Sequence, residues 1–255
     1  MSDVIYEKHG HIAHIKLNRP ERLNALSRSL AKELAKIWID FRDDSDLWVA
    51  VLSGVGKSFC SGADIEGLQT KTWEFRQSLI FGDDSLSPNT YQVWKPIIAA
   101  VHRHVYGGGM WLALECDIRI ATPDALFGLP EAKVNIPVMF TAFISRFLPP
   151  GIAAELLFRG NSIDANRAYE LGLINKIVEK EELMSTAVTW AEELCDNGPL
   201  SVKAMKEIFY RTRDMDHAGA LALTEHLVTP VFRSDDFQEA KKAFKEKRKP
   251  QWTLR

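Results

Sequence analysis

Residues 106–111 read Tyr-Gly-Gly-Gly-Met-Trp, with three successive glycines between an apolar run and a helical pattern. The apolar run at residues 96–101 is typical of a buried strand, and residues 110–114 are predicted to form a helix. Such a turn presents backbone N–H groups at the positive end of a helix, where developing negative charge is favoured. A tight structural turn is the alternative, but three glycines cost more chain entropy than a turn requires. The stretch therefore indicates a functional turn.

A second stretch of small residues lies earlier in the chain. Residues 58–65 read Ser-Phe-Cys-Ser-Gly-Ala-Asp-Ile and follow an apolar run at residues 48–52. Because the side chains are small, a backbone N–H in this loop can approach a ligand closely. The sequence thus places two glycine-bearing loops directly after two predicted buried strands.

The remaining pattern predicts an α/β fold with a helical end. Residues 12–17 alternate as a strand, and Ser27 is predicted to cap a helix with one apolar face, formed by Leu30, Leu34, Ile37, Trp38 and Phe41. From about residue 151 onward the patterns are almost all helical. We therefore expect an α/β core at residues 1–195 that carries the site, and a helical C-terminal appendage at residues 196–255.

Composition excludes several classes of function. The 255 residues carry a formal net charge of -2, which gives no reason to expect nucleic acid or an anionic membrane as a partner. The three cysteines form no CxxC pair, and no stretch approaches the ~20 apolar residues that span a bilayer. His102 and His104 share a strand face but lack a third ligand, so no metal site is expected. We expect a cytoplasmic protein.

Five separated segments resemble, in order, the motifs of the crotonase (enoyl-CoA hydratase/isomerase) superfamily. They are Asn18–Leu26, Phe59–Ile65, Gly107–Asp117, Phe127–Glu131 and Phe244–Pro250, and they cover nearly the whole chain. The resemblance implies a spiral of ββα units with a helical C-terminal trimerisation region, assembled as a homotrimer or a dimer of trimers. It also implies an acyl-CoA substrate, with coenzyme A as part of that substrate and no separate cofactor.

The resemblance also implies a catalytic device. The thioester oxygen would lie between the backbone N–H groups of Ala63 and Gly108, which stabilise an enolate. Glu131 matches the acid/base carboxylate of the family, and an apolar surrounding would raise its pKa toward neutrality. A surface glutamate after a proline is the alternative for Glu131.

Substrate-binding residues are implied in the same way. Arg22 and the terminal lysines are candidates for the phosphates of coenzyme A, although a solvated charged face explains them equally well. The full set implied for coenzyme A and substrate is Arg22, Ala25, Ala63, Asp64, Ile65, Glu66, Gly108 and Trp111.

Trp111 departs from the family pattern. Hydratases of the family carry a second glutamate there, whereas indole is only a hydrogen-bond donor and has no basicity to use. Glu115 lies one helical turn further on, a displacement of about 6 Å that is large against catalytic tolerances. Residues 136–140 read Ile-Pro-Val-Met-Phe and lack the glycine-rich run that hydratases of the family usually carry after this proline. We therefore expect a reshaped acyl pocket.

Several reactions remain open on this reasoning. One carboxylate and an oxyanion hole suffice to move a proton between two carbons, so enoyl-CoA hydratase/isomerase chemistry is the leading prediction, with Trp111 filling part of the acyl pocket. The alternatives are a Δ3-Δ2-enoyl-CoA isomerase, a decarboxylase or a C–C hydrolase of the superfamily. A non-catalytic acyl-CoA-binding protein is a further alternative, and RNA binding is disfavoured by the near-neutral charge.

Overall fold

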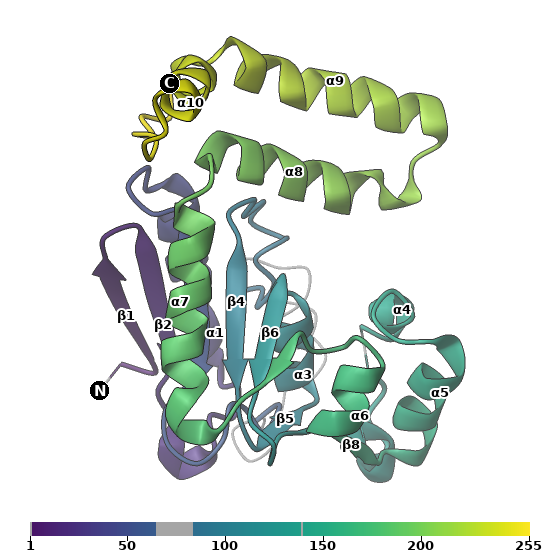
Figure 1. The fold of residues 1–255 in the computed structure, drawn as a ribbon. Helices are drawn as coiled ribbons and strands as arrows, with labels where there is room; N and C mark the ends of the chain where they lie inside the picture. Colours follow the sequence, from purple (N-terminus) through teal and green to yellow (C-terminus); the bar gives the residue numbers. More distant parts are fainter. Residues whose placement is uncertain (1, 65–83, 139) are drawn as a thin grey trace.

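A six-stranded sheet with the strand order β1-β2-β3-β4-β6-β9 forms the centre of the molecule (Figure 1). The structure, a computed structural model, describes residues 2–64, 84–138 and 140–255. β1 runs antiparallel to β2, and the other neighbouring strands are parallel. The strands are β1 (Val4–His9), β2 (Ile12–Leu17), β3 (Val49–Gly54), β4 (Ile97–Val101), β6 (Ile118–Ala121) and β9 (Lys176–Ile177).

Helices cover both faces of this sheet. α1 (Arg28–Asp43) and α3 (Gly108–Leu114) share one buried apolar cluster with the sheet, and α7 (Leu183–Cys195) forms a second cluster with it (Figure 1). Strands buried on both faces read as continuous apolar runs, which explains the sequences of β3 and β4. The predicted cap of α1 is confirmed, because the Leu30 N–H donates to the Ser27 hydroxyl at 3.1 Å.

A second, three-stranded sheet was not predicted from the sequence. It contains β5 (His104–Tyr106), β7 (Leu126–Gly128) and β8 (Ser162–Asp164), with β5 parallel to β7 and β7 antiparallel to β8. Each strand has three residues, too few for an alternating pattern to show in the sequence. The chain enters this sheet only two residues after β4 ends, so the two sheets adjoin where the second glycine turn begins.

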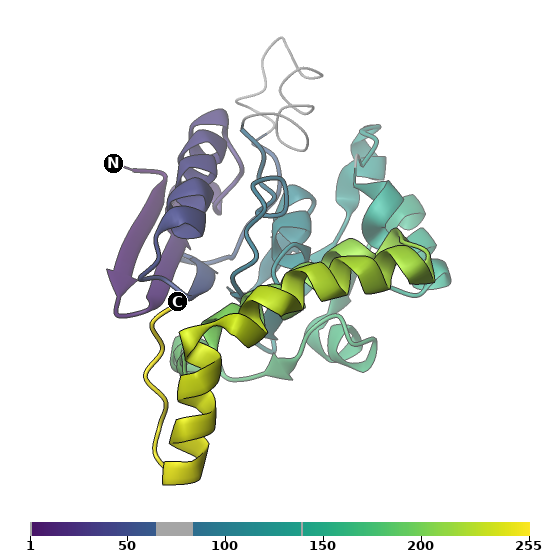
Figure 2. The same cartoon turned by 90° about the horizontal axis from the view of Figure 1, so that it is seen from above.

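The second half of the chain is mainly helical, as expected. α4 (Thr141–Ile144), α5 (Pro150–Arg159) and α6 (Ala165–Glu170) lie beside the small sheet, and α8 (Pro199–Arg211), α9 (His217–Arg233) and α10 (Asp235–Glu246) follow α7. Figure 1 shows α9 on the far side of α8 from the large sheet, and Figure 2 shows α10 projecting from the body of the molecule. The α/β core with a helical C-terminal region is thereby confirmed. The boundary at residue 195 stays a prediction, and the break between α7 and α8 falls beside it.

Buried ionic contacts fix α8 to the core. Lys206 Nζ lies 2.7 Å from Asp117 Oδ2 and donates to the Lys95 carbonyl at 2.9 Å, so α8 is held where β4 and β6 begin. Arg146 and Asp214 form a second link at 2.7 Å between the α4–α5 connection and the turn after α8. Among the helices of the described ranges, none is both long and apolar enough to cross a membrane.

Candidate active site

The two glycine-bearing loops are in contact. Cys60 pairs with Val105 in an isolated parallel bridge, which aligns the first loop with β5. Gly62 has φ +97°, and a Cβ there would lie 3.0 Å from the Tyr106 carbonyl oxygen and 3.7 Å from Gly107 Cα. Any side chain larger than hydrogen would therefore force the loops apart, in a conformation that L-residues rarely adopt.

Among the described residues, the two amides that the family resemblance singles out have no hydrogen-bond acceptor. Gly108 is the first residue of α3, so its N–H has no acceptor within the helix. The bridge between Leu26 and Ala63 uses the N–H groups of Leu26 and Asp64, at 2.8 and 3.1 Å. Within the described residues the Ala63 N–H has no hydrogen-bond acceptor. Both amides are thus available to a ligand.

The small sheet brings Glu131 to the second glycine turn. β5 and β7 pair Tyr106 with Gly128, and the Gly107 N–H donates to the Gly128 carbonyl at 2.9 Å. Glu131 follows β7 in the 3₁₀ turn Pro130–Val134. A Cβ on Gly107, whose φ is +52°, would overlap Glu131 Oε1 and lie 3.2 Å from its Cδ, and Oε2 is buried. The carboxyl group therefore lies directly against the turn that carries the Gly108 amide.

Trp111 lies one helical turn after Gly107 and is 5% exposed. Its ring stacks on Phe140, with centroids 4.9 Å apart and planes 17° apart, and on Phe143 at 5.9 Å. Phe140 belongs to the segment that departs from the family's glycine-rich pattern. An aromatic cluster thus surrounds Trp111, the residue predicted to replace the second glutamate of the family's hydratases.

Glu115 does not join Glu131. Its Oε2 accepts hydrogen bonds from the Ser87 hydroxyl and, at 2.7 Å, from Asn89 Nδ2. The side chain is buried, and desolvation raises the pKa of its carboxyl group. Glu115 is therefore bound to residues 87–89, at the far end of α3 from the glycine turn.

The residues implied for coenzyme A lie partly beside the first loop. Asp64 pairs with Arg19 at 2.9 Å, and the buried Ala25 accepts from Arg19 Nη1 through its carbonyl at 2.6 Å. Arg22 is exposed on the 3₁₀ turn Pro20–Arg22. Ile65 and Glu66 lie outside the described residues.

The C-terminal basic run is partly neutralised within the chain. Arg248 forms ion pairs with Glu239 and Glu246, and Lys249 pairs with Asp196 at 2.8 Å. One of the terminal lysines considered for the phosphates of coenzyme A, Lys249, therefore already has a carboxylate partner.

Arg19 and Asn24 hold the first loop, and the sequence did not single them out. The buried Asn24 side chain accepts from the Arg19 N–H at 2.8 Å and donates to the carbonyls of Ser58 and Val55, at 2.8 and 3.0 Å. Its φ of +55° follows a φ of +50° at Leu23, and non-glycine residues rarely have such values. The only available signal was the membership of both Arg19 and Asn24 in the first family motif.

The two histidines do not form a metal site. His102 Nε2 lies 3.1 Å from the Gly56 carbonyl oxygen, and His104 Nδ1 lies 2.9 Å from the Ser58 hydroxyl. No group of three side chains suited to a metal ion occurs in the part of the chain that the structure describes.

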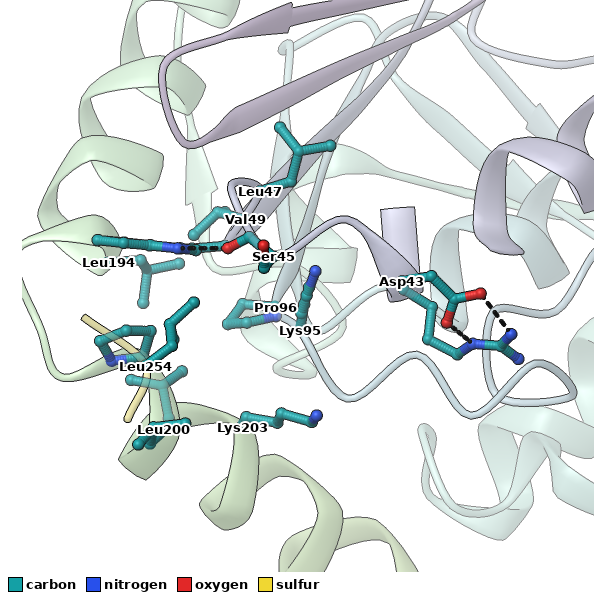
Figure 3. A pocket seen from close by; sticks show the side chains of 14 residues that line it. Asp43, Ser45, Leu47, Val49, Lys95, Pro96, Leu194, Leu200, Lys203 and Leu254 are labelled. Carbon is teal, nitrogen blue, oxygen red and sulfur yellow. Dashed lines mark hydrogen bonds and ion pairs between the residues drawn. The ribbon is translucent and has the colours of Figure 1, made fainter. Parts of the chain in front are cut away.

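A cavity of about 250 Å³ lies at the end of the large sheet where β3 and β4 begin, opposite the glycine turns (Figure 3). Its wall includes Val49 and Pro96, where β3 and β4 begin, whereas the glycine turns follow the ends of β3 and β5. Lys95 in this cavity donates to the carbonyls of Phe41 and Asp44 at the end of α1, and burial lowers its pKa to about 8. Lys95 therefore caps the C-terminus of α1. The cavity is remote from Glu131.

Comparison with known proteins agrees with this geometry. The family model for enoyl-CoA hydratase/isomerase matches residues 7–255. The chain is 38% identical to a short-chain-enoyl-CoA hydratase of Clostridium acetobutylicum, over 98% of this chain and 97% of that protein. It is 37% identical to an (E)-benzylidenesuccinyl-CoA hydratase of Thauera aromatica, over 97% of both chains.

Solved structures show the same fold. The crystal structure of enoyl-CoA hydratase from Mycobacterium tuberculosis superposes with a TM-score of 0.92 at 33% identity and covers 99% of both chains. That of enoyl-CoA hydratase from Bacillus anthracis gives 0.91 at 30% identity and 98% of both chains. The predicted crotonase fold is confirmed, and the chain belongs to the enoyl-CoA hydratase/isomerase family of acyl-CoA enzymes.

Proposed function

We propose that the chain holds an acyl-CoA thioester with its carbonyl oxygen between the N–H groups of Ala63 and Gly108, and that Glu131 moves a proton on the adjacent carbon. The observation that carries this proposal is the packing of the Glu131 carboxyl group against Gly107, in the turn next to two amides that have no acceptor among residues 2–64, 84–138 and 140–255. Each such amide contributes about 3 kcal/mol to stabilising the negative charge on the oxygen of an enolate. A carboxyl group at this position is suited to removing and returning the proton.

The arrangement around Trp111 favours isomerisation of a 3-enoyl to a 2-enoyl thioester. In this reaction Glu131 takes a proton from carbon 2 and returns it to carbon 4, so no second carboxylate is required. Trp111 stacked on Phe140 offers no base, and Glu115 is bound to Ser87 and Asn89. One carboxyl group and two amides account for the whole reaction.

Hydration of a 2-enoyl thioester is the second candidate. It is favoured by the 37% and 38% identity to two proteins described as hydratases. Glu131 alone would then activate the water and return its proton to carbon 2. No observation on this chain favours decarboxylation or C–C hydrolysis over these two reactions.

The two candidates are separated by substrates. The protein is incubated with crotonyl-CoA and with 3-hexenoyl-CoA, and the products are identified by chromatography and mass spectrometry. Formation of 2-hexenoyl-CoA supports isomerisation, and formation of 3-hydroxybutyryl-CoA supports hydration. Deuterium exchange at carbon 2 of butyryl-CoA in heavy water reports the enolate step by itself. Absence of all three activities would contradict the proposal.

The helical C-terminal region is proposed to mediate the homotrimer or dimer of trimers. None of the residues of α9, all of which the structure describes, is buried, although the helix carries the 56% exposed Leu221 and the 59% exposed Phe232. Exposed apolar helices are typical of protein interfaces. Light scattering coupled to gel filtration measures the assembly, and a monomer would contradict it. Coenzyme A is proposed to enter only as part of the substrate.

A further inference from the structure

A second cavity, lined by aromatic and polar side chains, lies at the other end of α3, and Trp111 forms part of its wall. Its volume is about 240 Å³. Four segments enclose it: residues 87–90, the end of α3, the α4–α5 connection, and the end of α8 with the turn after it. Glu115 lies about 10 Å from Gly108 along the helix, given seven residues at a rise of ~1.5 Å. The cavity therefore lies within reach of the far end of a medium-length acyl group.

Two buried polar atoms of the cavity residues lack partners. Trp111 Nε1 and Asn89 Oδ1 are shielded from solvent and have no hydrogen-bond partner among the described residues. A buried polar atom left unsatisfied costs about 1–3 kcal/mol, so such atoms call for a ligand or an ordered water. Indole N–H is only a donor, so its missing partner is a hydrogen-bond acceptor.

The charged residues of the cavity favour an anion. Arg146 and Arg213 both line it, and Arg146 is neutralised by Asp214 at 2.7 Å. Arg213 stacks on the rings of Phe209 and Tyr210 but forms no ion pair with any described residue. Glu115 is the only acidic residue of the lining, and because burial raises the pKa of Glu115, its carboxyl group holds its proton more readily. The lining thus combines an unpaired guanidinium group with an unpaired N–H donor.

We propose that this cavity binds the far end of the acyl group and selects acyl-CoA thioesters that carry a carboxylate there. The carboxylate accepts a hydrogen bond from Trp111 Nε1 and pairs with Arg213, while the rings of Phe143 and Phe147 contact the carbons before it. This inference rests on the proposed function, because it places the thioester of the same molecule at Gly108. It adds the substrate class, which the catalytic turn itself does not determine.

The test compares two thioesters of equal length, octanoyl-CoA and suberyl-CoA, which differ only in a terminal methyl or carboxylate. Binding is measured by calorimetry, and turnover is measured with the corresponding 3-enoyl and 2-enoyl thioesters. The full-length protein should bind the carboxylate-ended thioester at least about tenfold more tightly, as expected for a charge-assisted hydrogen bond. The same preference should appear in kcat/KM.

Variants assign the preference to Arg213. Arg213→Met should abolish the preference for suberyl-CoA over octanoyl-CoA. The affinity for octanoyl-CoA should change less than about twofold, since its terminal methyl group makes no ionic contact. Arg213→Lys should retain part of it, because the charge stays but the planar fork is lost. Arg211→Met is the matched control, since Arg211 lies two residues away, pairs with Glu207 and does not line the cavity. Circular dichroism checks that each variant is folded.

Equal affinity for the two thioesters, or a preference that survives Arg213→Met, would overturn this inference. If a methyl-ended thioester is then still turned over, the proposed function stands without it. If the preference is found but neither thioester reacts, the cavity assignment stands and the proposed reaction fails. Binding of neither thioester would overturn both.

Discussion

A glutamate side chain lies at each end of α3, and the comparison shows how location decides what a carboxyl group does. At the first end, Glu131 lies against the Gly107 turn, where backbone amides are the available polar groups. At the other end, Glu115 is held by the side chains of Ser87 and Asn89. Only Glu131 lies beside amides suited to stabilising an enolate, so only Glu131 is placed for proton transfer.

The difference also explains why Trp111 is compatible with activity. Trp111 lies between the two ends, with Gly107 one turn before it and Glu115 one turn after it. Its buried ring lines the cavity that would recognise the far end of the acyl group. On the proposed function, Trp111 replaces a catalytic carboxylate of the family and instead shapes the acyl site.

The largest effect is expected when Glu131 is replaced. Glu131→Gln keeps the shape of the side chain but cannot accept and return a proton, so kcat should fall about 10³-fold. Glu115→Gln should reduce kcat far less, because Glu115 does not lie at the glycine turn. Steady-state kinetics on whichever enoyl thioester is turned over measures both. Equal losses in the two variants would remove the distinction between the two ends of α3.

A smaller loss is expected when the contact between Gly107 and Glu131 is disturbed. In Gly107→Ala the added methyl group would overlap Glu131 Oε1 and displace the carboxyl group, so kcat should fall about 10²-fold. Gly10→Ala is the matched control, because Gly10 has φ +55° against +52° at Gly107 but no atom within 4 Å of an added Cβ. Both variants place a side chain at a positive φ, and Gly107 has in addition a ψ of −125°, outside the left-handed helical region, so the strain of Gly107→Ala is the larger of the two. If Gly10→Ala lost as much activity, strain rather than displacement would be the cause.

The buried ion pair between α8 and the core should contribute more to stability than an exposed ion pair. Lys206→Met leaves the largely buried Asp117 carboxylate without its ammonium partner, so the free energy of unfolding should fall by about 3 kcal/mol. Lys249→Met removes an ion pair whose lysine side chain is 82% exposed and should change stability by less than about 0.5 kcal/mol. Denaturant titrations measure both changes. A loss of stability in Lys206→Met comparable to that in Lys249→Met would show that α8 is held by other contacts.

The smallest effect is a pH dependence of stability caused by Glu115. Because the pKa of Glu115 is raised in the folded protein, its stabilising contribution is complete below the unfolded pKa of about 4.3 and is lost as pH rises through the folded pKa. Glu115→Gln cannot ionise, so its stability relative to the parent protein should increase with pH over that window. Thermal unfolding of both proteins at a series of pH values measures the difference. A difference that does not change with pH would contradict the burial of an ionisable group there.

Local patterns predicted much of the large sheet and the helices. The apolar face of α1 and its Ser27 cap were correct, because a 3.6-residue period and an N-cap are properties of neighbouring residues. The buried strands β3 and β4 were correct for the same reason. The small sheet was missed, because its three-residue strands are specified by pairing between distant segments rather than by their own sequences. The cavity at Glu115 was missed as well, since its walls come from four separate segments.

By itself, the sequence determined that this chain has an α/β core with two glycine-bearing turns, and it predicted Glu131 as the acid/base carboxyl group and Trp111 in place of a second one. Only the tertiary structure decided that the Gly62 and Gly107 turns touch and that Glu131 lies against one of them. It also decided that Glu115 lines the cavity at the other end of α3. The physical reason is that turn chemistry and helix periodicity are local properties of the chain. The packing of Glu131 against Gly107 depends on a hydrogen-bonded strand pair between residues more than twenty positions apart.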